Sequence, residues 1–249
     1  MKLDYHSRTL ELLEADSLAQ LSESAELTAW ERENGVVLPP SYREWCKLTI
    51  GDPALRFFSN MDSFFLTSPR LREDEEFGTC VEFMRENQGN YELAIALDSS
   101  DDPPVIYSWC AGKRVRHAAT FSDYVFTQIF DWQFKIEDIE AQGVAIEGIT
   151  DRYDPRAGRE NTIQIGSVDD LREIAALFPN RGPTTTYYVE GDRYSEDRYW
   201  GSNDQRLRLI ANHTDGTTLL TLFGTEAILP VYARIKETLA ERIVKVIWE

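Results

Sequence analysis

The stretch Glu82–Trp109, EFMRENQGNYELAIALDSSDDPPVIYSW, predicts three consecutive strands and decides the fold of the first half of the chain. In Tyr91–Leu97 every second residue is large and apolar, which is the period of a strand with one strongly buried face. Asn87–Asn90 contains residues that tolerate positive φ, so we expect a hairpin there. Asp98–Pro104 is too acidic and too rich in proline to extend a strand, so it predicts a loop before Val105–Trp109.

Helices are predicted on the N-terminal side of this stretch. Leucines at helical spacing predict an amphipathic helix over residues 7–21, and a second helix over 25–33 ends at Asn34-Gly35, which accept the left-handed conformation of a C-cap. Ser41-Tyr-Arg-Glu44 has the form of a capping box, in which the Ser41 hydroxyl and the Glu44 carboxylate bind free amides at a helix start. This third helix is predicted to end at Gly51 and to turn four side chains inward: Tyr42, Trp45, Cys46 and Leu48.

Periodicity leaves residues 71–77 open between a short helix and a charged loop. Residues 112–116 predict a turn into a further strand, and they form the only basic cluster of the first half. A helix over residues 121–130 follows, capped by Ser122 or Thr120, with Val125 and Ile129 on its inner face.

Glycines and little periodicity after residue 140 place a domain boundary between residues 148 and 149. In the second part we expect strands over 162–165 and 184–189 and a helix over 167–177. Asp215-Gly216 predicts a hairpin between 206–212 and 217–223, and Val231, Ile235 and Leu239 mark a helix that opens at Pro230. Residues 243–248 either continue that helix or form a last strand. The predicted fold class is α+β: domain 1–148 with a central, mostly antiparallel sheet flanked by helices, and a smaller α+β unit over 149–249.

Negative charge is concentrated in the first part of the chain. The net charge is −17, and residues 1–149 hold 27 acids and 13 bases, a balance of −14. Such a surface repels nucleic acid and anionic membranes and speeds the encounter with a basic protein, although it can also serve solubility alone. The candidate partner-binding residues therefore lie in two acidic segments, 73–76 and 98–102. They are Glu73, Asp74, Glu75, Glu76, Asp98, Asp101 and Asp102.

Sequence motifs for chemistry are absent. The chain has no HExxH, CxxC, GxSxG, Walker or GxGxxG motif. Its three cysteines are an odd number at wide, irregular spacing, which favours reduced thiols over a disulfide framework or a zinc site. The 98–102 loop lacks the glycine and the distal glutamate of a calcium-binding loop. Cys110 with His117 could form a nucleophile–base pair across a hairpin, but a strand cysteine beside a surface histidine is the simpler interpretation. We expect no catalytic residue, no cofactor and no bound metal.

The sequence also bears on location. It has no run of 18 apolar residues, and its N-terminal segment lacks an apolar signal-peptide core. We therefore expect a cytoplasmic protein that neither spans nor binds a membrane, while nothing in the sequence predicts an oligomeric state.

One resemblance covers about residues 8–135. WERENGVVLPPSYREWCKLTIG, Trp30–Gly51, resembles the opening of the SUKH superfamily, in which an acidic helix, a glycine and Leu-Pro precede a tyrosine-containing helix that ends in a glycine. Cys80–Trp109 resembles the central strands of the family, and Phe121–Val125 resembles its closing helix. The chain differs in having Ile50-Gly51-Asp52 where the family has Asn-Gly-Gly.

The resemblance implies an α+β protein without an established catalytic site. Many bacterial members are immunity proteins that bind and neutralise a toxin, and fungal members are regulatory scaffolds of cell-wall synthesis. The leading hypothesis is therefore an immunity protein that blocks a cognate toxin by stoichiometric binding, with a basic nuclease domain as one suitable partner. The alternatives are a regulatory scaffold without a toxin partner and an enzyme built from dispersed carboxylates.

Overall fold

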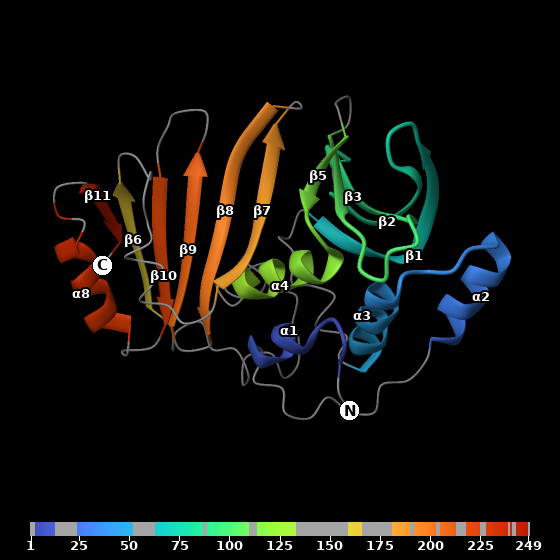
Figure 1. The fold of residues 1–249 in the computed structure, drawn as a ribbon, viewed down its shortest axis with the longest axis horizontal. Helices are drawn as coiled ribbons and strands as arrows, with labels where there is room; N and C mark the ends of the chain where they lie inside the picture. The colour runs from blue at the N-terminus through green and yellow to red at the C-terminus, as the bar shows by residue number, and fades with distance from the viewer. Residues whose placement is uncertain are drawn as a thin grey trace. The chain divides into compact units, whose positions relative to one another are not determined.

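The computed structural model describes most of the chain and divides it into two compact α+β units, Met1–Tyr153 and Asp154–Glu249. The ranges that it describes are 3–12, 24–51, 63–86, 89–109, 114–132, 159–165, 181–189, 192–202, 205–212, 218–224, 228–238, 240 and 243–248. The predicted boundary at 148/149 lies outside the described residues. Figure 1 shows a sheet with helices in the first unit and, in the part of the second unit that the structure describes, a sheet with the helix α8.

The first unit is built on a meander of consecutive antiparallel strands in the order β1-β2-β3-β4-β5. The strands are β1 (Ser63–Asp74), β2 (Gly78–Glu86), β3 (Tyr91–Ala96), β4 (Val105–Trp109) and β5 (Arg114–Ala118). The three strands predicted in Glu82–Trp109 are therefore confirmed as β2, β3 and β4, and Gly89, with φ of 76°, lies in the turn between the first two.

Residues 71–74 differ from both alternatives, a short helix and a charged loop, because they are strand, and only residues 75–77 form a turn. Residues 71–74 end β1, residues 75–77 turn, and Gly78 with φ of 70° begins β2. The pairing with β2 decides the conformation of this segment, and its periodicity could not reveal that pairing.

The helices of the first unit are α1 (Ser7–Leu12), α2 (Ala25–Asn34), α3 (Pro40–Gly51) and α4 (Phe121–Trp132). In Figure 1, α1, α3 and α4 gather on one side of the sheet. Aromatic rings join these layers: Phe121 of α4 lies 5.2 Å from Phe83 of β2 and 5.3 Å from Tyr42 of α3, between ring centroids. The inward positions predicted for α3 and α4 are confirmed by the burial of Tyr42, Trp45, Leu48, Val125 and Ile129, whereas Cys46 is only partly buried.

Gly35 ends α2 as predicted. Its φ of 67° is left-handed, and its amide donates to the carbonyl of Glu31. The predicted cap of α4 is Thr120, whose hydroxyl accepts from the amide of Asp123 at 3.1 Å.

The capping box predicted at Ser41 and Glu44 is wrong. The helix α3 already begins at Pro40, which suits a first helical position because it has no amide hydrogen to lose. The Ser41 amide donates to the carbonyl of Asp101 at 3.0 Å, and the Glu44 carboxylate binds the N-terminal segment instead. Tertiary partners have replaced the local ones.

We predicted that β3 buries one face strongly, but the structure buries side chains on both of its faces. Leu93 and Ile95 are buried against the helices, but Ala94 and Ala96 on the opposite face are buried as well. The opposite face packs the two alanines in a small cluster with Cys80 of β2 and Ile106 of β4.

The second unit is an antiparallel sheet in the order β7-β8-β9-β10-β6-β11, with α8 (Ile228–Thr238) against β10. Its strands are β6 (Arg159–Ile165), β7 (Arg181–Val189), β8 (Asp192–Ser202), β9 (Gln205–Asn212), β10 (Thr218–Gly224) and β11 (Ile243–Trp248). The predicted hairpin of β9 and β10 is confirmed, and residues 243–248 form a strand. Sequence reasoning missed β8, and the predicted helix over 167–177 lies outside the described residues.

Candidate functional site

The acids of the β1–β2 turn divide into structural and exposed groups. Asp74 Oδ1 accepts the amides of Glu76 at 2.8 Å and Phe77 at 2.9 Å, while Oδ2 forms an ion pair with Arg114. The Asp74 side chain is only 4% exposed. Burial acts to raise the pKa of Asp74, but the bonds from Arg114 and the two amides outweigh it, and the pKa lies below its usual range. Asp74 therefore shapes the turn and cannot meet a partner.

The other acids of this turn face solvent. Glu73 is exposed and accepts from the Thr79 hydroxyl at 3.0 Å, and Glu75 and Glu76 are exposed at the tip of the turn. These three carboxylates remain accessible to another protein.

The loop between β3 and β4 shows the same division. Asp102 binds the start of α4: its carboxylate accepts hydrogen bonds from the Ser122 amide at 3.0 Å and from the Ser122 hydroxyl at 2.5 Å. Asp98 accepts the amide of Ser100 at 3.0 Å and is exposed, and Asp101 is exposed while its carbonyl accepts from Ser41. The loop is thus tied to both α3 and α4, which fixes where the Asp101 carboxylate is presented.

Asp101 lies on a surface groove of about 810 Å³, which we call the α3 groove. Three segments line it: the N-terminal residues before α1, the α2–α3 linker with the start of α3, and the β3–β4 loop. The lining residues are Leu3, Asp4, Tyr5, Val36, Val37, Leu38, Pro39, Pro40, Arg43, Glu44, Lys47, Thr79, Leu97, Ser99, Ser100 and Asp101. Val37 is 77% exposed, an unusual position for a large apolar side chain.

Two carboxylates hold the walls of the α3 groove in place. Glu44 accepts three successive amides, from Asp4 at 2.9 Å, Tyr5 at 3.0 Å and His6 at 2.8 Å. Glu31, the buried residue of α2, accepts the Leu38 amide at 2.7 Å and binds the Arg43 guanidinium at 2.9 Å. Charge-assisted bonds of this kind are stronger than neutral ones, so the groove has pre-formed walls.

The electrostatic potential at one end of the α3 groove is negative. The pKa of the Tyr5 phenol is raised, first by partial burial and then by the charges of Asp101 and Asp4. Both acids are exposed, and within the described ranges neither carboxylate accepts a hydrogen bond or forms an ion pair. This end of the groove suits a cationic group.

The candidates for chemistry find no support in the geometry of the described residues. His117 is buried, at 3% exposure, and lies between the rings of Tyr107 and Tyr124, so the predicted surface histidine is wrong. Its proposed partner Cys110 lies outside the described residues. Burial raises the pKa of the Cys80 thiol to about 11, which keeps it protonated and unreactive. Within the described ranges, no three His, Cys, Asp or Glu side chains gather as a metal ion would need.

Sequence reasoning missed most of the α3 groove. Of the seven acids that it proposed, only Asp101 lines the groove, together with Asp4, Tyr5 and Val37, which it had not singled out. The exposed Val37 between a C-cap glycine and two prolines is the signal that could have indicated this surface.

No protein-family model, no curated protein and no solved structure matches the chain. Across the described ranges, no helix is both long enough and apolar enough to cross a membrane.

Proposed function

We propose that this chain is a non-catalytic protein-binding protein of the SUKH type, and that it acts in the cytoplasm as an immunity protein against a toxin. It binds a basic toxin domain in one-to-one stoichiometry and blocks it. The observation that carries the proposal is the α3 groove, in which an exposed apolar wall at Val37 lies in the same hollow as the acids Asp4 and Asp101.

The groove combines the two components of a protein interface. Apolar side chains that lose their water supply binding energy, and peripheral charges of one sign speed association with a partner of the opposite sign. The concentration of negative charge in residues 1–149 extends the attraction beyond the groove. The exposed acids Glu75, Glu76 and Asp98 add to this negative field, although they lie outside the α3 groove and have no assigned contact with the partner.

The order of elements supports the choice of family. In the first unit α2, a glycine cap, a Leu-Pro segment, α3, the meander and α4 follow one another, which is the order that the resemblance implies. The binding mode proposed needs no catalytic residue.

The test begins with partner capture. The tagged chain is incubated with lysate of its source cells, the bound protein is identified by mass spectrometry and purified, and its activity is measured with increasing amounts of the chain. We expect inhibition to be complete at one equivalent. A captured protein whose activity is unchanged would contradict toxin neutralisation and would favour the regulatory scaffold.

The groove is then tested with the purified partner. The double substitution Asp4→Lys with Asp101→Lys should slow association at least about tenfold, because it reverses the charge that attracts a basic protein. Val37→Asp should speed dissociation. The matched control is Glu26→Lys with Glu33→Lys, which makes the same change of charge at exposed positions of α2. Equal effects of both double variants would show that the partner is attracted by net charge alone and does not bind in the α3 groove.

A further inference from the structure

The sheet of the first unit has a second charged surface, on the face opposite to α1, α3 and α4. Residues that pair across antiparallel strands share a face, and every second residue along a strand lies on the same face. Register and alternation, starting from Cys80, Ala94 and Ile106, therefore define this face, which we call the outer face. Its arginines are Arg70, Arg72, Arg85, Arg114 and Arg116, and its acids are Asp74, Glu82 and Glu92. The outer face is therefore net positive, although residues 1–149 carry a balance of −14.

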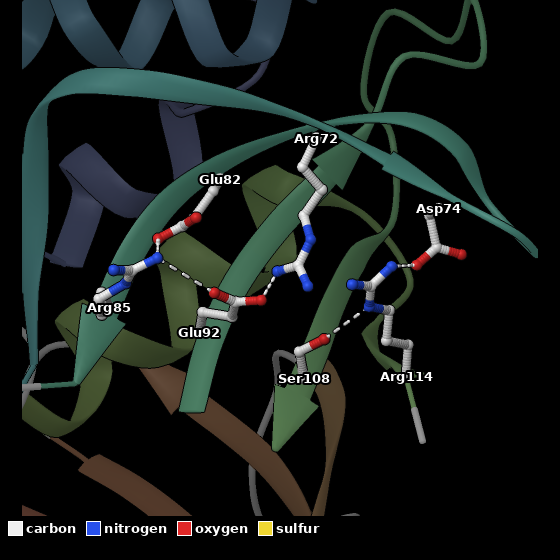
Figure 2. A network of polar contacts seen from close by, with 7 residues as sticks. All are labelled: Arg72, Asp74, Glu82, Arg85, Glu92, Ser108 and Arg114. Carbon is white, nitrogen blue, oxygen red and sulfur yellow. Dashed lines mark hydrogen bonds and ion pairs between the residues drawn. The ribbon is translucent and has the colours of Figure 1, made fainter. Parts of the chain in front are cut away.

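The acids of the outer face are all engaged (Figure 2). Glu92 uses one carboxylate oxygen for an ion pair with Arg72 and the other for Arg85 at 3.4 Å, while Arg85 also pairs with Glu82 at 2.7 Å. Asp74 uses Oδ2 for Arg114 and Oδ1 for two amides of its own turn. These carboxylates hold Arg72 and Arg114 from opposite sides.

The two guanidinium groups between these anchors face one another. Figure 2 shows Arg72 beside Glu92 and Arg114 beside Asp74, with the remaining nitrogens of the two arginines directed into the gap between them. Arg114 also donates from Nε to the Ser108 hydroxyl at 3.0 Å, which fixes the plane of its guanidinium. Among the described residues, no acceptor binds Nε or Nη2 of Arg72 or Nη2 of Arg114.

The gap between Arg72 and Arg114 is accessible to solvent. The guanidinium nitrogens that face each other across it bind no carboxylate among the described residues. The side chains of Arg72 and Arg114 are 26% and 28% exposed. Burial lowers the pKa of Arg72, and repulsion from the charge of Arg114 lowers it further, against the opposing charges of Glu82 and Asp74. On the same face Cys80, Ala94 and Ala96 form a small buried cluster with Ile106, against which Phe77 packs.

We propose that the gap between Arg72 and Arg114 on the outer face binds a single oxyanion, the phosphate or carboxylate group of a small molecule. Each guanidinium is a planar fork of donors that matches the oxygens of such a group, and a bound anion replaces the repulsion between the two arginines by attraction to both. The acidic surroundings exclude a polyanion such as a nucleic acid, because long-range repulsion grows with each added charge. The site does not depend on the proposed toxin partner.

The test is a calorimetric titration of the full chain with inorganic phosphate and, separately, with acetate, each at constant ionic strength set with NaCl. We expect saturable one-to-one binding. Saturation by phosphate alone assigns the site to a phosphate group, saturation by acetate alone assigns it to a carboxylate, and absence of saturation by both overturns the proposal.

Variants locate the binding. Arg72→Gln and Arg114→Gln should each weaken it at least about tenfold, since each removes charged hydrogen bonds to the anion. Arg32→Gln, on the exposed surface of α2, makes the same change of net charge and should leave binding unchanged; an equal loss there would overturn the proposal. Circular dichroism checks folding. If a glutamine variant does not fold, Arg72→Lys serves as the test, because lysine keeps the positive charge but lacks the planar pair of donors of a guanidinium. We expect weaker binding in that variant, and unchanged binding would contradict the geometry proposed.

Discussion

At the scale of the residue, the acids of this chain differ by what they bind. Asp98, Asp101 and Asp102 stand in one loop, yet only Asp102 accepts two bonds from Ser122 at the start of α4. A helix begins with amides that lack partners within the helix, and a carboxylate placed there both accepts a hydrogen bond and lies at the positive end of the helix dipole. Asp102 is thus a tertiary cap supplied from 20 residues away in the sequence.

Asp102→Ala should lower the free energy of unfolding by about 1–2 kcal/mol, because the amide and hydroxyl of Ser122 lose their acceptor. Urea denaturation followed by tryptophan fluorescence measures the change. Asp101→Ala is the matched control, since the Asp101 side chain is exposed, and it should stay within about 0.5 kcal/mol of the unsubstituted chain. Equal losses in the two variants would contradict the role of Asp102 as a cap.

His6 is a buried histidine whose bonding selects its neutral form. Its Nε2 lies 2.9 Å from the Ser41 carbonyl and must donate, while Nδ1 has no partner among the described residues. Burial lowers the pKa of His6 from 6.5, against the opposing effects of the Ser41 carbonyl, Glu44 and Asp102. Protonation would therefore place a second N–H in a site without an acceptor.

Stability should consequently fall as the pH decreases below about 6.5, because the unfolded chain then binds a proton at His6 that the folded chain does not. Above that pH the contribution of His6 is fully present. Urea denaturation of the unsubstituted chain and of His6→Gln across this pH range isolates the effect. The variant should show a smaller dependence on pH, and identical slopes would exclude His6 as the source.

At the scale of the element, the short N-terminal segment is held by one side chain of α3. Glu44 accepts amides from three consecutive residues, Asp4, Tyr5 and His6, just before α1. A six-residue helix such as α1 is too short to be stable alone, so its position depends on tertiary contacts. The anchor also forms one wall of the α3 groove.

Glu44→Ala should release this segment. We expect faster hydrogen exchange at the amides of residues 4–12 and a loss of about 2 kcal/mol in stability, because three donors lose one charged acceptor. Exchange measured by mass spectrometry of peptides reports the local effect. Glu33→Ala, on the exposed surface of α2, should leave exchange at residues 4–12 unchanged; release in that variant too would contradict the anchoring role of Glu44.

At the scale of the whole molecule, charge is the dominant property. The chain carries −17, and most of this charge belongs to residues 1–149. Self-repulsion of a compact charged chain opposes folding, and salt screens it.

The midpoint of thermal unfolding should therefore rise when NaCl is increased from about 0.01 M to about 0.1 M, over which the screening length falls from about 30 Å to about 10 Å. Differential scanning calorimetry measures the midpoint. NaCl and KCl should act equally, because screening depends on ionic strength and not on the cation. A fall with both salts would show that the ion pairs of the structure outweigh the repulsion.

Much of the fold follows from local signals. The strands β2, β3 and β4 follow from alternation and turn residues, the end of α2 follows from Gly35, and the hairpin of β9 and β10 follows from Asp-Gly. Each signal acts within a few residues, where the conformational preferences of single residues decide the outcome. The capping box fails because distant partners bind Ser41 and Glu44, whereas residues 71–74 become strand through pairing with β2 only a few residues further on.

The sequence by itself determined the α+β class, the strands around Glu82–Trp109 and the concentration of acids in residues 1–149. Only the tertiary structure decided which acids are free, since Asp74 and Asp102 bind partners 40 and 20 residues away. It also decided that Asp101 shares a groove with Val37, and that Arg72 and Arg114 face one another. The physical reason is that strand register and helix packing bring together groups from distant parts of the chain, which no local pattern records.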